Sequence, residues 1–250
     1  MTLTSKVKME RTRDYLLHCL WIIILCAAVG AAATGELYVK PSSTAACPSS
    51  TCYTLDHILQ NPSQYLISNL TIFFLADIYE ISTQGQLVVT NVNNLAFVGR
   101  VRKGQLLSKI RCTKNFGLAF MKGINVSISQ LSIENCGVNF SRAVLQKLEN
   151  YWPPTDISAA LTFTEINSLS ISGVSVITPN GYGLATNLFN SNITGSTFSN
   201  SSSGNFQLYY TPSNLVYRQF FLRIASSQFM HGMCRSSPGY GCGLSMSYCS

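Results

Sequence analysis

The stretch from Ile124 to Gly137, INVSISQLSIENCG, decides the fold. Apolar residues alternate with Ser and Asn on both sides of a polar step at Gln130, which is the pattern of two short strands joined by a turn. The same pattern recurs at residues 166–178, INSLSISGVSVIT, and at residues 188–200, LFNSNITGSTFSN. A strand, a kink and a second strand within so few residues suit one corner of a solenoid, where the chain turns without leaving the stack.

The spacing of the turn steps gives the length of the repeat. When Gln130, Gly173 and Gly195 are taken as equivalent, the gaps are 43 and 22 residues, which we interpret as two coils and one coil of about 22 residues. A shorter copy occurs at residues 94–99, and a looser one at residues 221–229. We therefore predict an all-β chain, a parallel β-helix whose corners lie one above another around an aliphatic interior. Charged residues make up only 11% of the chain, so Ser, Thr and Asn must supply most of the polar surface.

Residues 1–35 have the order of a secretory signal peptide. A basic start precedes the apolar run from Leu16 to Val29, and Ala31 to Ala33 offers a cleavage site. An uncleaved signal anchor is the alternative, because the apolar run with its alanines approaches the roughly 20 residues that span a bilayer. In either case we expect the protein to be secreted or to lie on the extracellular face of the plasma membrane.

Residues 36–250 are predicted to form a single β-helix domain. It opens with a short helix, because residues 54–66 have helical apolar spacing that ends at Pro62. Such a helix would cover the open end of the stack. At the other end the strand pattern stops without a cap or a second hydrophobic span, which predicts that the domain is incomplete at its C-terminus. A membrane would then be reached only through an uncleaved leader or a missing C-terminal span.

The cysteines fit an extracellular compartment. Cys47 and Cys52 bracket a short loop that a disulfide could close, whereas Cys112 and Cys136 are about one coil apart and could face each other on neighbouring coils. The last three cysteines allow one pair and one free thiol, and they are Cys234, Cys242 and Cys249. No C-x-x-C pair is present and the leader-free chain has only two histidines, so we predict no metal site and no cofactor.

Five asparagines lie in N-x-Ser/Thr sequons and are predicted glycan acceptors: Asn69, Asn125, Asn139, Asn192 and Asn200. A chain rich in Ser and Asn also produces sequons by chance, and asparagines at solenoid corners often stack on one another. For Asn125 stacking is the alternative to glycosylation, because it aligns with Asn167 at a repeat corner.

The most basic stretch covers residues 100–122, and no carboxylate occurs between Glu80 and Glu134. An unopposed cluster attracts anions, which outside the cell are sulfated or uronic glycans and lipid head groups. Nucleic acid does not suit a secreted chain, and a solvated side loop is the simpler alternative. The members of this predicted anion-binding patch are Arg100, Arg102, Lys103, Lys109, Arg111, Lys114 and Lys122.

The corner pattern, the spacing and the leading helix resemble the right-handed parallel β-helix of the pectin-lyase-like family. The segment CYTLDHILQ (52–60), followed by LTIFFLADIYEI (70–81) and NVNNLAFVG (91–99), is similar to uncharacterised extracellular β-helix proteins of simple animals. This resemblance covers residues 47–250 and implies an architecture, because a fold alone does not imply an activity.

The resemblance does not extend to catalytic motifs. Pectate lyases of the family hold calcium with clustered carboxylates and use an arginine base, and its polygalacturonases use several aspartates on adjacent coils. Outside the leader this chain has three scattered aspartates: Asp56, Asp77 and Asp156. We therefore predict a non-catalytic extracellular module that binds a polysaccharide or a cell-surface protein. The alternative is a divergent polysaccharide lyase or glycoside hydrolase that uses Glu134 or Glu165 with a basic residue such as Arg111.

Overall fold

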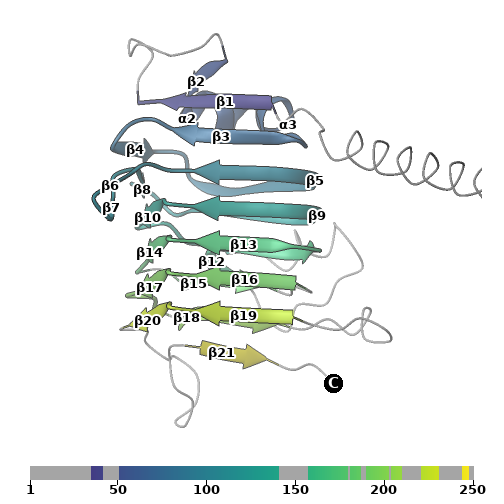
Figure 1. The fold of residues 1–250 in the computed structure, drawn as a ribbon, viewed down its shortest axis with the longest axis vertical. Coiled ribbons are helices and arrows are strands. Elements are labelled where there is room, and N and C mark those ends of the chain that lie inside the picture. The colour runs from purple at the N-terminus through teal and green to yellow at the C-terminus, as the bar shows by residue number, and fades with distance from the viewer. Residues whose placement is uncertain are drawn as a thin grey trace, which may run out of the picture. The chain divides into compact units, whose positions relative to one another are not determined.

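The computed structural model describes residues 35–41, 51–140, 157–179, 181–186, 190–202, 204–209, 221–230 and 244–247. These residues form a solenoid of parallel strands (Figure 1). Several predicted features lie outside the described residues: the targeting segment through residue 34, Cys47 and the last three cysteines. The same holds for Asp156, one of the three aspartates.

Three stacks of parallel strands make up the solenoid, and we call them faces 1, 2 and 3. Face 1 consists of the first halves of β5 (Gly85–Val98) and β9 (Phe116–Ser129), then β12 (Ile157–Ile166), β15 (Tyr182–Thr186), β18 (Gly204–Tyr209) and β21 (Leu244–Ser247). Face 2 consists of β2 (Cys52–Thr54), β1 (Gly35–Lys40), β3 (Leu70–Phe74), the second halves of β5 and β9, β13 (Leu169–Ser172), β16 (Asn190–Thr194) and β19 (Phe221–Ala225). Face 3 consists of β4 (Ile78–Ile81), β8 (Lys109–Cys112), β10 (Ser132–Glu134), β14 (Ser175–Ile177), β17 (Thr197–Ser199) and β20 (Gln228–Met230).

The corner between faces 2 and 3 is the predicted column of turn steps. Gln130, Gly173 and Gly195 all have left-handed backbones, with φ of 54°, 60° and 55°. The Gln130 amide donates to the Ser172 carbonyl at 3.0 Å, and the Gly173 amide donates to the Thr194 carbonyl at 2.9 Å. The predicted stacking of these three residues is therefore confirmed. Gly residues and a polar residue suit this column because side chains with a branched Cβ disfavour a left-handed backbone.

The predicted coil count at this corner is wrong. Ser129 pairs directly with Ser172, so Gln130 and Gly173 lie on adjacent coils. The 43-residue gap is therefore one coil that carries additional residues, and not two coils. The additional residues include 141–156, which lie outside the described part of the chain.

Gly99 begins the same corner column at the N-terminal side. Its amide donates to the Ser129 carbonyl at 2.9 Å. A Cβ placed on Gly99 would lie 2.0 Å from the carbonyl oxygen of Gln130, which is backbone and cannot swing away. Glycine is required here because the two coils approach closely, and not because of an unusual φ.

The interior of the first coils is more aromatic than predicted. Phe74, Phe97, Phe120 and Phe163 lie on successive coils, with ring centroids 6.3, 5.6 and 5.3 Å apart along the column. All four are buried, and they share the core with aliphatic residues from the three faces. The expectation of an aliphatic interior is therefore wrong for this part of the solenoid, where stacked and edge-on aromatic rings pack between the three faces.

Two short helices, and not one, precede the first coil. α2 (Leu55–Gln60) begins after Thr54, whose side chain accepts a hydrogen bond from the His57 amide at 3.3 Å. Pro62 does not simply end this helix but begins α3 (Pro62–Tyr65), a position where a proline without an N–H is well tolerated. The buried side chains of Leu55 and Ile58 belong to the same hydrophobic core as the coils.

Candidate functional site

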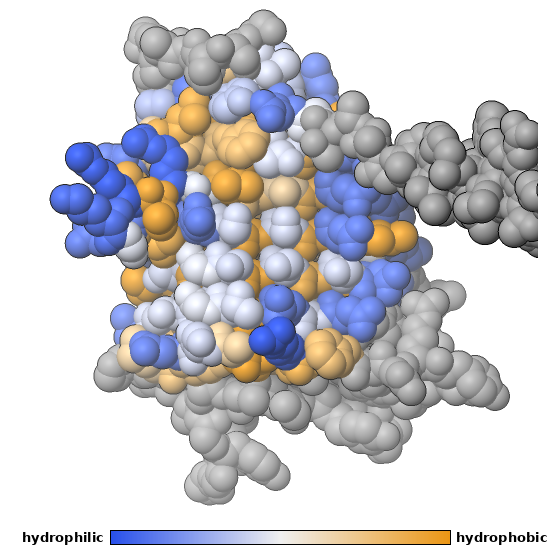
Figure 2. All heavy atoms as spheres, viewed as in Figure 1, coloured by the Kyte–Doolittle hydropathy of each residue, from blue (hydrophilic) through white to orange (hydrophobic). Residues whose placement is uncertain are grey.

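A small antiparallel hairpin projects from the solenoid at the corner between faces 2 and 3. β6 (Val101–Arg102) pairs with β7 (Gln105–Leu106), so that Arg102 lies opposite Gln105. The two tip residues, Lys103 and Gly104, have φ of 50° and 79°, as two-residue hairpin turns that match the strand twist require. Figure 2 shows a hydrophilic protrusion where Figure 1 places β6 and β7.

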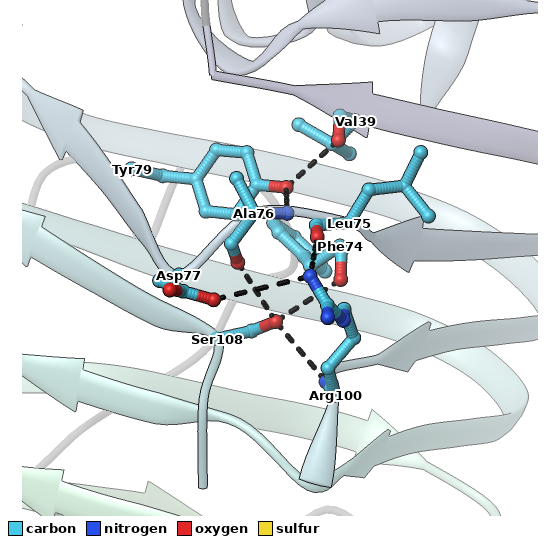
Figure 3. Close-up of polar contacts among 8 residues, drawn as sticks. All are labelled: Val39, Phe74, Leu75, Ala76, Asp77, Tyr79, Arg100 and Ser108. Atoms are coloured by element: carbon cyan, nitrogen blue, oxygen red, sulfur yellow. Dashed lines mark hydrogen bonds and ion pairs between the residues drawn. The ribbon is translucent and has the colours of Figure 1, made fainter. Parts of the chain in front are cut away.

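The base of the hairpin is tied to the preceding coil through one buried hydroxyl. The Leu107 amide donates to the Arg100 carbonyl at 2.8 Å and closes the hairpin. The Ser108 hydroxyl accepts from the Arg100 amide at 3.0 Å and lies 3.0 Å from the carbonyl oxygens of both Phe74 and Ala76, to which it can donate (Figure 3). Ser108 is fully buried, so these bonds do not compete with water. The tip therefore rests on a fixed base.

Arg100 belongs to this base and not to a free cationic surface. Its guanidinium donates to the Leu75 carbonyl and lies 3.9 Å from the Asp77 carboxylate, which is 72% exposed (Figure 3). Next to it, the Tyr79 hydroxyl accepts from the Ala76 amide at 2.6 Å and donates to the Val39 carbonyl at 2.8 Å. Burial raises the pKa of Tyr79, so the hydroxyl stays protonated as this donation requires.

Lys109 and Arg111 are neutralised by a carboxylate from the next coil. The Glu134 carboxylate lies 3.2 Å from the Lys109 Nζ and 3.1 Å from an Arg111 guanidinium nitrogen, and it also accepts from the Ser132 hydroxyl at 3.3 Å. Glu80 pairs in register with Arg111 on the other side. The prediction of an unopposed patch is wrong for these residues, because stacking brings together carboxylates that lie more than 20 positions away in the sequence.

The remaining members of the predicted patch do not form one surface. Lys122 lies at the corner between faces 1 and 2, where it is in register with Glu165. Lys114 follows β8 at the corner between faces 3 and 1. Arg102 and Lys103 are exposed on the hairpin, and within the described part of the chain neither forms an ion pair. The structure thus separates the seven cations and leaves two adjacent ones on a projecting element.

The arrangement does not favour the catalytic alternative. Burial raises the pKa of the Glu134 carboxyl, but hydrogen bonds and charges from Arg111 and Lys109 outweigh it, so the pKa lies below its usual range. A general acid for glycoside hydrolysis needs a raised pKa. Glu165 lies at the corner between faces 1 and 2, whereas Glu134 lies on face 3, so the two carboxylates do not form a pair. Among the described residues no three His, Cys, Asp or Glu side chains are grouped as metal ligands.

The predicted cystine between neighbouring coils is confirmed. Cys112 at the end of β8 and Cys136 after β10 form a disulfide, and both residues are buried. Cys52 is also disulfide-bonded, but its partner lies outside the described residues. The pairing of Cys47 with Cys52 therefore stays a prediction.

Two of the predicted glycan acceptors belong to a ladder of asparagines on the outside of the solenoid. The Asn94 side-chain amide donates to the Asn69 oxygen at 2.8 Å, and that of Asn125 donates to the Asn94 oxygen at 2.9 Å. All three have left-handed backbones, with φ between 55° and 57°. The alignment of Asn125 with Asn167 is wrong by one residue, because Val126 pairs with Leu169 and Asn125 therefore lies opposite Ser168.

The other sequons lie on different elements. Asn192 is half-buried on β16, and its amide oxygen has no hydrogen-bond partner in the structure. Asn200 is exposed at the corner after β17, and Asn139 lies on β11 (Val138–Phe140), which pairs antiparallel with β12. Glycosylation of the five asparagines stays a prediction, and an exposed position favours Asn200 over Asn192.

The sequence did not predict the roles of Ser108 and Asp77 at the hairpin base, or of Asn94 in the ladder. The glycine at 104, in a short connection between two strand-forming runs, was a weak signal for the hairpin tip. The recurrence of Asn-Leu at residues 69 and 94 would have indicated the ladder. Nothing in the sequence indicates that Ser108 is buried, because an isolated serine is surrounded by other residues only once the chain has folded.

No family model, curated protein or solved structure matches this chain. The resemblance to pectin-lyase-like proteins therefore stays a hypothesis that rests on the coil pattern. Within the described residues, no helix has the length and apolar character needed to cross a membrane.

Proposed function

We propose that this protein is a non-catalytic extracellular β-helix module that binds an anionic glycan, sulfated or uronic, through the β6–β7 hairpin. The observation that carries the proposal is the pair of exposed cations Arg102 and Lys103 on a fixed base. The cations that flank them, Arg100 and Lys109, are held against carboxylates at 3.9 and 3.2 Å. The hairpin therefore presents two adjacent cations to solvent on a projecting element.

The chemistry of the tip suits sulfate and carboxylate groups. A guanidinium offers a planar fork of donors that can bind two oxygens of one anionic group, and the lysine adds a point charge next to it. Because the base of the hairpin is already ordered by Ser108, less conformational entropy is lost on binding than for a free loop. Two exposed cations give a modest affinity that weakens steeply as salt screens the charges.

We also propose that the chain is secreted and that it folds as a right-handed, capped solenoid. The leader would direct the chain to the secretory pathway, where disulfides form and sequons are glycosylated. The Cys112–Cys136 disulfide supports this compartment. We take the solenoid to be right-handed, and α2 to cap its N-terminal end, since the buried Leu55 and Ile58 extend the core beyond the first coil.

Chromatography on immobilised heparin tests the binding surface. We expect the Arg102→Ala/Lys103→Ala variant to elute at clearly lower salt than the wild type. The matched control, Lys114→Ala/Arg223→Ala, removes the same charge from exposed positions elsewhere and should elute close to the wild type. Equal shifts of the two variants would mean that net charge, and not the hairpin, holds the glycan.

Two further measurements test the remaining parts. The full chain is expressed in secretory animal cells. N-terminal sequencing of the protein in the medium then reports leader cleavage, and peptide-N-glycosidase digestion reports glycosylation.

Catalysis is tested by incubating the purified protein with uronic-acid polysaccharides, with and without calcium. Release of unsaturated or reducing ends in proportion to protein would contradict the non-catalytic assignment.

A further inference from the structure

β5 is the first strand of face 1, and within the described residues one edge of its first half is unpaired. On the side toward the N-terminus, a hollow separates β5 from α3 and the residues that follow it. β3 pairs only with the second half of β5, from Leu95 to Val98. Within the described residues, no strand therefore pairs with the N-terminal edge of residues 85–91. We call this edge and the hollow beside it the β5 edge groove.

The backbone groups of this edge point into the hollow. The Gly85 amide donates to the Asn115 carbonyl at 2.8 Å, so Gly85 and alternate residues after it face β9. The backbone N–H and C=O groups of Val88 and Thr90 point away from β9 and into the hollow, because successive residues of a strand turn these groups to opposite sides. Neither hydrogen-bonds to the α3 side within the described chain. Asn91, with φ of 57°, ends this run of strand.

The groove is large enough for an extended segment. It has a volume of about 380 Å³ and lies between residues 62–68 and residues 88–92. Every residue in these two walls is uncharged. Ile67 is 46% exposed beside the edge, whereas the neighbouring Ser68 hydroxyl is already used by the Asn93 amide at 3.0 Å. A charged side chain placed here would find no partner of opposite sign in these walls.

The edge also lacks the features that protect free edges in natural sheets. Such edges usually carry Lys, Pro or a bulge, and here α3 and residues 66–68 lie across the hollow without pairing with the edge. Residues 86–90 are Gln-Leu-Val-Val-Thr, with no charge and no proline. Unpaired donors and acceptors, a hollow beside them and an uncharged lining together match strand addition, in which main-chain bonds give affinity and side-chain pockets give selectivity.

We propose that the β5 edge groove binds an extended, uncharged peptide segment of a protein partner, which adds a strand to face 1 along residues 86–90. The segment would be about five residues long, since the edge spans roughly 16 Å at the rise of a strand. Hydroxyl or small apolar side chains fit the lining, and lysine or acidic side chains do not. This surface is separate from the hairpin, so its test is independent of glycan binding.

The test uses a synthetic probe, an acetylated and amidated hexapeptide of alternating Thr and Val, with a Lys-for-Thr version as the charged comparison. Amide NMR signals of the full chain are followed during titration. We expect the Val88 and Thr90 amides to shift saturably with the neutral probe and at least tenfold more weakly with the charged one. The variant Thr90→Lys, at an exposed position, should weaken the neutral probe at least tenfold.

Two more variants complete the test. Val88→Pro removes an N–H that points into the groove while leaving the bonds to β9, and it should also weaken the probe at least tenfold. Gln228→Lys adds the same charge at an exposed position on face 3, and it should stay within twofold of the wild type. Absence of a saturable shift, or unchanged affinity in Thr90→Lys, would overturn the proposal. A dimer of the protein alone that is lost in Thr90→Lys would also overturn it, because the occupant would then be a second copy.

Discussion

Removing the cystine that joins β8 to β10 tests how much one cross-link contributes to the solenoid. Cys112 and Cys136 are 24 residues apart, and the loop that they close contains β9 and β10, which form one complete coil. In the chain-entropy description, closing a loop of that length stabilises the folded state by about 3.4 kcal/mol at 25 °C. We expect the Cys112→Ala/Cys136→Ala variant to lose about that free energy of unfolding, with a further contribution from the two buried sulfur atoms.

The measurement is guanidinium denaturation of the wild type and the double variant, followed by circular dichroism with and without reductant. Loss of packing persists in reductant, whereas the effect of the cross-link does not. The difference in unfolding free energy should therefore fall from about 4–5 kcal/mol to about 1 kcal/mol when dithiothreitol is added. A difference that stays the same under both conditions would refute the loop-closure reasoning and assign the effect to packing.

Three further predictions concern single residues. Glu134→Gln should lower the free energy of unfolding at pH 7 by about 0.5–1 kcal/mol. Pairing with Arg111 depresses the folded-state pKa of Glu134, so this stabilisation is present above the unfolded pKa and is lost as the pH falls through the folded pKa. Urea titrations of the wild type and the variant should therefore show a difference at pH 7 and none at pH 3. Ser108→Ala leaves a buried amide without its acceptor, so it should cost about 1–3 kcal/mol in thermal unfolding and reduce retention on heparin, and unchanged retention would show that the hairpin base does not depend on this hydroxyl. Gly99→Ala should cost about 3 kcal/mol, because its Cβ would meet the Gln130 carbonyl oxygen, and a wild-type melting temperature would contradict the close approach.

The architecture was predictable because its signal is local. A left-handed corner selects Gly or a small polar residue, and alternation selects a strand, so the column of Gln130, Gly173 and Gly195 could be read from the sequence. The coil count was not predictable in the same way. An insert about as long as a coil produces the same spacing as an extra coil, and only the pairing of Ser129 with Ser172 distinguishes them.

The electrostatics of the candidate site needed the register. Glu134 is distant from Arg111 in the sequence, and their contact exists only because β8 and β10 are stacked. Counting charges along the chain therefore overestimated the patch. It still included Arg102 and Lys103, the two adjacent exposed cations on the hairpin. The cystine was easier to predict, because two cysteines about one coil apart need only an approximate period.

The hairpin is inserted between two residues that already bond to each other. The Arg100 amide can donate to the Ser108 hydroxyl whatever the length of the connection between the two residues, and β5 and β8 stay paired with their neighbours in the stack. A tip of different length or chemistry could therefore be exchanged there while the scaffold is inherited unchanged. Evolution of binding specificity at this corner would need few compensating substitutions elsewhere, and the same position is a natural graft site for protein engineering.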